Sequence, residues 1–136
     1  MRHIGPNERQ WELLLNYLDQ NESVTMLNLL MYRESADYSE YPEEIPCSGE
    51  EAYKRYSKLV FPSLKSFGGQ VLFSGKAFEP LIGPDEERWD EVLLVEYPSI
   101  TAFLAMVNSE QYRSIVYHRT AALKDSRLIP IIRSAA

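Results

Sequence analysis

The sequence predicts an α+β domain, in which one antiparallel sheet carries two helices on one of its faces. The first observation is Glu91–Tyr97, a run of mostly β-branched and large apolar residues that predicts a central strand covered on both faces. The second is the end of this run, because Pro98 ends a strand and Ser99 is a good N-cap for a helix. The third is the element order, which is strand, helix, strand, strand, helix, strand once a first helix is set aside.

Length, charge and cysteine content limit the classes of protein. The 136 residues fit one domain with its own apolar core. The formal charge is −6 and no basic stripe is present, so we expect no nucleic-acid partner. The single Cys47 cannot form an internal disulfide. Residues 1–20 lack the apolar run of a signal peptide, and no segment approaches about 18 consecutive apolar residues, so we expect a cytoplasmic protein without a membrane partner.

Periodicity and capping residues divide the chain into elements. A first helix is predicted from about Glu8 to Gln20, capped by Asn7. Strands are predicted at Val24–Tyr32, Gln70–Phe78, Glu91–Tyr97 and Ser126–Ile132, and the second of them is expected at an edge of the sheet. Helices are predicted to begin after Ser48 and after Ser99. The first of these two is kinked or restarted at Pro62, and the second is interrupted at Asn108-Ser109. This is the ferredoxin-like βαββαβ pattern. It predicts an N-terminal helical extension at residues 1–22 and a ferredoxin-like domain at residues 23–136.

The sheet face away from the helices is expected to be covered by a second molecule. We assign Met26, Leu30, Val92 and Leu94 to this face, and leaving them in water would forgo about 6–12 kcal/mol. A second copy of the sheet is the favoured cover, which predicts a homodimer. The N-terminal helix is the competing cover.

Several segments resemble one known family, in colinear order over residues 24–132. They are Asn28–Tyr32, Gly68–Gly75, Trp89–Ser99, Ala102-Phe103 with Met106 and Tyr112, and Arg119–Ile129. These segments resemble the bacterial domain-of-unknown-function family thirteen-thirty. The resemblance implies a dimeric α+β barrel, in which two ferredoxin-like sheets close face to face, and it implies no agreed substrate. The first helix and the long loop from Arg33 to Cys47 depart from the shorter family pattern, so a pocket would be covered differently here.

Asn28 and Glu96 are the candidate catalytic residues, because each is a polar residue in a central strand that is otherwise apolar. A buried carboxylate needs a cation or several hydrogen-bond donors. The candidate partners of Glu96 are Asn28, Arg33, Arg127 and the hydroxyls of Tyr32 and Tyr53. The functional interpretation is a general base or a substrate-orienting carboxylate in a barrel pocket. The alternative is that Glu96 lies at a wet strand end and pairs with an arginine that fixes the dimer.

Five residues are candidates for binding a substrate: Trp89, Arg127, Arg119, Tyr32 and Tyr53. Trp89 could form an aromatic wall for a flat ligand or could anchor the hairpin against the core. Arg119 and Arg127 could bind a carboxylate or phosphate, or could tie helix to strand through Asp125. Core packing accounts most simply for Tyr53.

No cofactor and no metal is expected. The sequence contains no glycine-rich phosphate loop, no paired His/Cys metal spacing and no nucleophile elbow. The resemblance to dimeric barrels in which a helical histidine holds haem makes His118 a haem or metal candidate. A lone histidine without a second ligand favours a solvent-exposed or capping role instead.

These observations lead to one functional hypothesis and one alternative. The hypothesis is a small dimeric barrel that binds a small aromatic or carboxylated metabolite between sheet and helices, with cofactor-free isomerase or monooxygenase chemistry. The alternative is a non-enzymatic ligand-binding or dimerisation module in which the same polar residues are structural.

Overall fold

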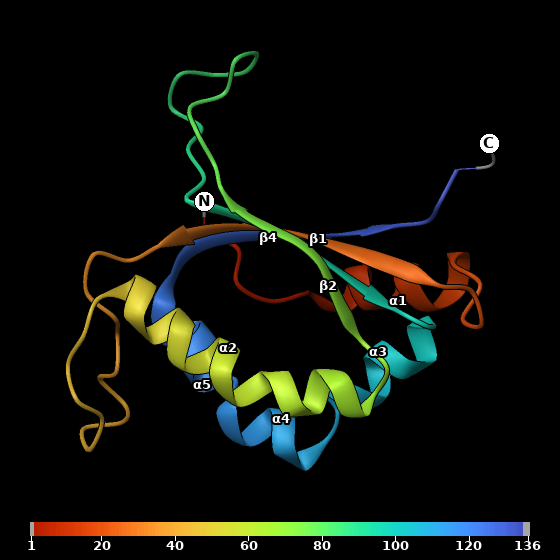
Figure 1. Ribbon diagram of the computed structural model, residues 1–136, viewed down its shortest axis with the longest axis horizontal. Coiled ribbons are helices and arrows are strands. Elements are labelled where there is room, and N and C mark those ends of the chain that lie inside the picture. Colours follow the sequence, from red (N-terminus) through yellow and green to blue (C-terminus); the bar gives the residue numbers. More distant parts are fainter. Residues whose placement is uncertain (1, 135–136) are drawn as a thin grey trace.

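The computed structural model describes residues 2–134 and confirms the ferredoxin-like fold. Four strands form one antiparallel sheet in the order β2-β3-β1-β4, and the helices lie on one face of it (Figure 1). The elements are α1 Glu8–Tyr17, β1 Val24–Tyr32, α2 Gly49–Ser66, β2 Gln70–Lys76, β3 Glu91–Tyr97, α3 Ile100–Val107, α4 Glu110–Ile115, α5 Tyr117–Ala122 and β4 Leu123–Ile131. The central strands are β1 and β3, as predicted.

The helix starts are determined by local side-chain caps. Asn7 and Gln10 form a capping box at α1, while the side chains of Ser48 and Ser99 cap α2 and α3. Several boundaries differ from the prediction, because α1 ends at Tyr17, β2 ends at Lys76 and β4 runs from Leu123 to Ile131. The helix α2 also continues through Pro62 to Ser66, so it does not restart there.

The strand register shows which residues face the helices. Asn28 lies opposite Leu93 of β3 and Leu128 of β4. Because side chains alternate along a strand, Met26 and Leu30 share the face of Asn28, and both are buried there at 2% and 0% exposure. Their assignment to the open face was wrong. The residues of β1 on that face are Thr25, Leu27, Leu29 and Met31.

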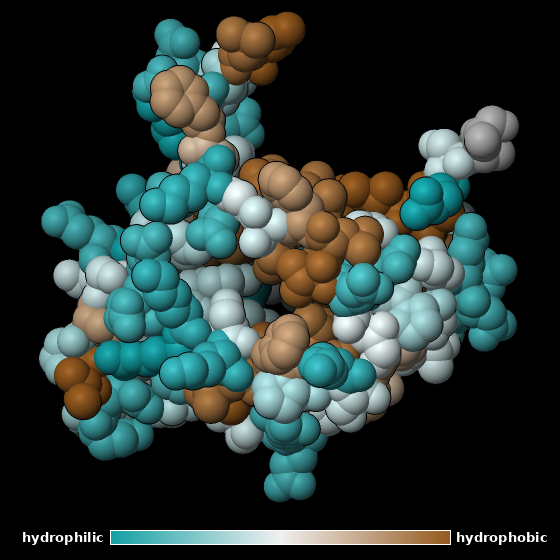
Figure 2. All heavy atoms as spheres, in the orientation of Figure 1, coloured by the Kyte–Doolittle hydropathy of each residue, from teal (hydrophilic) through white to brown (hydrophobic). Residues whose placement is uncertain are grey.

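The open face carries an apolar patch that no described segment covers. It comprises Leu27, Leu29 and Met31 of β1, Val92 and Leu94 of β3, Phe73 of β2, and Ile129 and Ile131 of β4. Phe73, Ile129 and Ile131 are exposed, and the others are half-buried by their neighbours. Brown side chains along the upper side of the molecule in Figure 2 mark this region.

The N-terminal segment packs on the helix side of the sheet. Trp11, Leu14 and Leu18 contact the core cluster that contains Val24 and Met26. Figure 1 shows α1 on the same side of the sheet as α2 and α3. The competing prediction, that this helix covers the open face, is therefore wrong, and α1 instead extends the layer of helices.

The connection between β2 and β3 projects from the opposite side. We call residues 77–90 the β2–β3 arm; in Figure 1 it rises away from the sheet on the side without helices. Its side chains Phe78, Leu81 and Ile82 are 91%, 99% and 95% exposed. Large apolar side chains this exposed are uncommon on a monomer and mark a contact surface.

Candidate functional site

A cavity of about 1270 Å³ lies between the sheet and the helices. The helix face of the sheet lines one side, and α2 with the α3–α5 segment lines the other. Residues 3–18 of the N-terminal segment contribute a third wall, including Ile4, Trp11 and Tyr17. The lining is mainly apolar and aromatic, with few polar groups, as is typical of sites for small molecules.

The polar residues of the sheet that line the cavity are Asn28 and Glu91, together with Ser74, Ser126 and Arg127. The Nδ2 of Asn28 donates to the carbonyl oxygens of Met26 and Leu93, each at 3.3 Å. Its Oδ1 accepts no hydrogen bond within residues 2–134 and so can accept one from a ligand. Glu91 lies diagonally across from Asn28 on β3, and its Oε1 accepts from the Tyr32 hydroxyl at 2.9 Å.

Five tyrosines line the cavity: Tyr17, Tyr53, Tyr56, Tyr97 and Tyr112. Burial raises the pKa of Tyr53 to about 12, against the opposing charge of Arg119. Burial also raises the pKa of Tyr56 well above its ordinary value. Both hydroxyls are therefore neutral near pH 7; that of Tyr56 donates to the Tyr112 hydroxyl at 3.3 Å, and that of Tyr53 can donate to a ligand.

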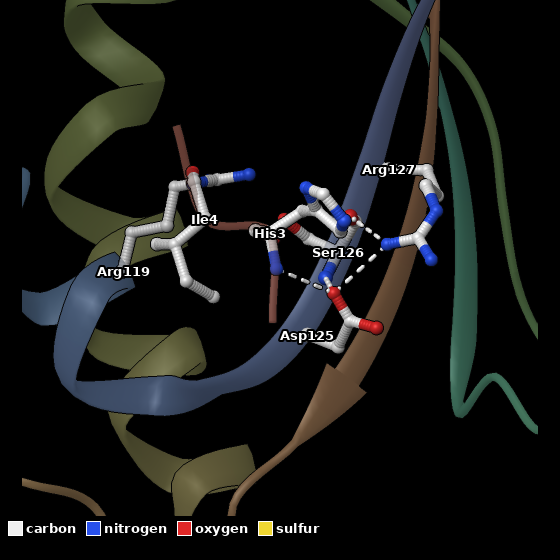
Figure 3. A network of polar contacts seen from close by, with 6 residues as sticks. All are labelled: His3, Ile4, Arg119, Asp125, Ser126 and Arg127. Atoms are coloured by element: carbon white, nitrogen blue, oxygen red, sulfur yellow. Dashed lines mark hydrogen bonds and ion pairs between the residues drawn. The ribbon is translucent and has the colours of Figure 1, made fainter. Parts of the chain in front are cut away.

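Arg119 is the cationic side chain on the helix side of the cavity. Its Nη1 donates to the Ile4 carbonyl oxygen at 2.7 Å (Figure 3). No carboxylate within residues 2–134 forms an ion pair with it. A half-buried guanidinium without a carboxylate is suited to bind an anionic group, and four of its five N–H donors lie outside the bond to Ile4.

Residues 2–6, which we call the N-terminal strap, close this wall of the cavity. Figure 3 shows the strap running beside β4. Ser126 Oγ donates to the His3 carbonyl at 2.6 Å, and the His3 backbone N–H donates to Asp125 Oδ1 at 2.8 Å. Arg2 adds a bond to the Leu123 carbonyl at 3.1 Å. The strap is thus tied to β4 by three hydrogen bonds where it reaches the cavity.

The structure brings together only part of the predicted site. Asn28, Tyr53, Arg119 and Arg127 line the cavity, and Tyr32 reaches it through Glu91. Glu96 lies opposite Thr25 and Gln70 on the open face, so it is separated from Asn28 by the sheet itself.

Arg127 also contacts Trp89, which lies outside the cavity. The Arg127 guanidinium lies 5.0 Å from the centre of the Trp89 ring, and its Nη1 is 2.8 Å from Asp125 Oδ1. Hydrogen bonds lower the pKa of Asp125 against the effect of its burial. The arrangement matches the structural alternative for Arg127, in which Asp125 holds it, and Trp89 does not line the cavity.

Glu91 and the N-terminal strap were not predicted from the sequence. Glu91 has the same side-chain parity as Leu93 and Val95, which face the helices. Pairing Asn28 with Leu93 would have identified it, but β3 is apolar on both parities, so the sequence did not select this register. The strap contacts residues more than a hundred positions away, which no local pattern encodes.

The long loop before α2 packs against α2 and α5 and contributes no lining residue to the cavity. The Tyr38 hydroxyl lies 2.7 Å from Nδ1 of His118, and Tyr41 stacks on Tyr117 with ring centres 4.1 Å apart. His118 is 5% exposed. The favoured expectation of an exposed or capping histidine is therefore wrong, because the loop buries the ring as part of the aromatic packing.

We expect His118 to make the protein less stable in mild acid. Burial lowers the pKa of its imidazole, opposed by Glu44 and reinforced by Arg55. Below about pH 6.5 the unfolded chain binds a proton at this histidine that the folded protein does not bind. The free energy of unfolding is therefore unaffected by this group above about pH 6.5 and falls as the pH drops below that value. Denaturant unfolding at pH 7 and pH 5.5 measures this loss.

The His118→Gln variant provides the control for that measurement. It keeps a polar side chain in the same place but has no proton to take up between pH 5 and pH 7. Its stability should change less than that of the wild type over this interval. Equal slopes in the two proteins would contradict the assignment to His118.

Residues 2–134 hold neither a metal cluster nor a membrane-spanning helix. No group of three or more His, Cys, Asp or Glu side chains among them is placed to hold a metal ion. No helix in this part of the chain is long and apolar enough to cross a bilayer.

The fold and cavity define a ferredoxin-like α+β protein with an aromatic pocket between sheet and helices. The chain belongs to the family described as "Domain of unknown function (DUF1330)", whose model matches residues 44–131. This confirms the resemblance seen in the sequence, over a shorter range. The strap and α1 lie outside the matched residues.

Solved structures support the same fold. RPA0582, a protein of unknown function from Rhodopseudomonas palustris, is 35% identical, covers 100% of both chains and has a TM-score of 0.90. A dimeric protein of unknown function from Bacteroides fragilis with a ferredoxin-like fold is 9% identical, covering 82% of this chain and 96% of its own, at a TM-score of 0.52. Hydroxynitrile lyase from Passiflora edulis is 10% identical. The match covers 85% of this chain and 97% of the lyase chain, with a TM-score of 0.58. No curated protein matches the sequence.

Proposed function

We propose that the protein is a cytoplasmic homodimer that binds a small aromatic or carboxylated metabolite in the cavity between sheet and helices. The observation that carries this proposal is Arg119, a half-buried cation at the cavity wall that pairs with no carboxylate of residues 2–134. A ligand carboxylate would neutralise it, and the neutral hydroxyl of Tyr53 would donate to the same anion. The aromatic walls suit a flat apolar body.

The chemistry that fits this site is proton transfer without a cofactor. Glu91 would remove a proton from a carbon beside a carbonyl and return it to another atom, which completes an isomerisation. The tyrosine hydroxyls would stabilise the enolate oxygen, and Asn28 Oδ1 would accept from a substrate hydroxyl. Monooxygenation of the same enolate would require O₂ as a second substrate. Glu96 would lie at the dimer face and take no part in the cavity.

Homodimer formation is supported by the apolar open face. A second copy would cover its half-buried side chains with an identical patch. The Bacteroides fragilis protein described as dimeric shares this fold. The open faces of two such sheets would close into a barrel.

A binding module without chemistry is the second candidate. Arg119 is already bonded to the strap and Glu91 to Tyr32, which holds both groups in place without a substrate. In that case the cavity would bind its ligand and release it unchanged.

The test is calorimetric titration with benzoate, phenylacetate and phenylpyruvate, with benzyl alcohol as the uncharged comparison. We expect Arg119→Gln to weaken carboxylate binding roughly 10- to 100-fold, as for loss of a charged hydrogen bond. Arg113→Gln is the matched control, because it removes an exposed arginine of α4 that does not line the cavity, and it should retain most of the affinity. Equal losses in both variants, or carboxylates binding no better than benzyl alcohol, would contradict the proposal.

Turnover separates the two candidates. The enzyme hypothesis expects accelerated enolisation of phenylpyruvate, followed by its ultraviolet absorbance, that is lost in Glu91→Gln while binding persists. Tight binding with no acceleration in the wild type would favour the binding module.

A further inference from the structure

The β2–β3 arm carries three large apolar side chains that its own chain does not cover. Phe78, Leu81 and Ile82 are each more than nine-tenths exposed, and they lie close together in the sequence of the arm. Figure 2 shows apolar side chains at the tip of this projection, separate from those over the sheet. Exposed apolar groups of this size favour removal from water by a partner.

Hydrogen bonds and an ion pair at the base of the arm hold its conformation, so the exposed apolar tip has a defined position. Arg88 forms an ion pair with Glu79 across the arm, and its Nε donates to the Asp85 carbonyl at 3.2 Å. The Ala77 N–H donates to the Asp90 carbonyl at 3.0 Å, and the Asp90 N–H to the Leu30 carbonyl at 2.7 Å. These bonds connect the arm to β1 and fix its direction relative to the open face.

We propose that the arm clasps a second copy of this chain seated on the open face, with Phe78, Leu81 and Ile82 packed against that copy. This inference rests on the homodimer of the proposed function and adds a contact that the flat face does not supply. The arm rises on the same side as the apolar patch of the sheet, so a molecule resting on that patch meets the arm beside it (Figure 1). Two-fold symmetry then gives each copy one arm to donate and one to receive.

The apolar area of the arm can be compared with the area that a stable protein interface buries. Burying the three side chains removes about 400 Å² of apolar surface from water per copy. A stable interface needs about 800 Å² per partner, so the arm supplies about half and the open face supplies the remainder. The arm alone does not account for an interface of ordinary size, so the apolar open face is needed as well.

The charge of the arm argues against a membrane as the occupant. Glu79, Asp85, Glu86 and Glu87 surround the apolar tip, with Arg88 as the only basic residue of the arm. An acidic projection is repelled by the anionic lipids of a cytoplasmic membrane surface. A second protein copy can instead receive the apolar tip while the acidic residues stay at the wet rim of the interface.

The experiment is sedimentation equilibrium of the full chain with the triple variant Phe78→Ser, Leu81→Ser, Ile82→Ser. We expect the dimer dissociation constant to rise at least roughly a hundredfold, as for loss of interface hot spots, while circular dichroism is unchanged. The control is Ile45→Ser, which removes a 74% exposed apolar side chain from the loop before α2. It should leave the dissociation constant within about threefold of the wild type.

Each other outcome overturns a specific statement. A triple variant that dimerises like the wild type overturns the role of the arm and leaves the homodimer standing. A wild-type protein that is monomeric at all concentrations overturns the homodimer and the arm with it. Co-sedimentation of the wild type, but not the triple variant, with phosphatidylcholine vesicles would show that the arm binds lipid and overturn the assignment to a second copy.

Discussion

Replacing Gly49 by alanine is expected to destabilise the protein by at least about 3 kcal/mol. A Cβ at this position would lie 2.6 Å from the Ala122 carbonyl oxygen and closer still to that of Arg33. Both are backbone atoms in a junction closed by the bonds Arg33 N–H to Ala122 O, at 2.8 Å, and Gly49 N–H to Arg33 O, at 3.0 Å. The start of α2, the end of β1 and the start of β4 meet there, so none of them can move without breaking these bonds.

Denaturant unfolding of Gly49→Ala and Gly5→Ala measures this effect. Gly5 is the matched control, because a Cβ there has nothing within 4 Å. Its variant should lie within about 0.5 kcal/mol of the wild type. A Gly49→Ala protein as stable as Gly5→Ala would show that the junction can open without cost.

A charge at the centre of the open face is expected to abolish the proposed homodimer. Leu94 lies opposite Leu27 and Phe73, so Leu94→Glu places a carboxylate in an apolar patch without a cation directly opposite it. In the monomer the new carboxylate reaches water, but in the dimer two copies of it would be buried. We expect dissociation to be favoured by at least about 4 kcal/mol, or roughly a thousandfold.

Sedimentation and thermal unfolding together check this result. The control is Leu59→Glu, at a 43% exposed apolar position on α2, away from the open face. It should leave the association state unchanged. A Leu94→Glu protein that still dimerises would mean that the copies associate through another surface.

The fold could be predicted from the sequence because each element has a clear local cause. Ser48 and Ser99 cap helices, and the apolar runs at Val24–Tyr32 and Glu91–Tyr97 match the observed strands. Which face each side chain occupies could not be predicted, because both parities of β1 and β3 are apolar. Because of that ambiguity, Met26 was predicted on the open face, whereas the structure places Leu27 there and buries Met26 under the helices.

The same ambiguity limited the prediction of the site. Asn28, Tyr53, Arg119 and Arg127 line one cavity, but the sequence singled out Glu96, whereas Glu91 has the parity that faces the helices. His118 was misjudged for a different reason, since its burial depends on the loop that brings Tyr38 to it. Tertiary contacts of this kind leave no periodic pattern in the sequence.

The N-terminal strap has a consequence for the order in which the chain becomes native. Its bonds to Asp125 and Ser126 span 122 and 123 residues, so they close nearly the largest loop available to the described chain. Such contacts form late, because the entropy of closing a long loop is lost before the bonds form. The strap precedes β4 in synthesis but can bind only once β4 is in place, so we expect the sheet to assemble before this wall of the cavity closes.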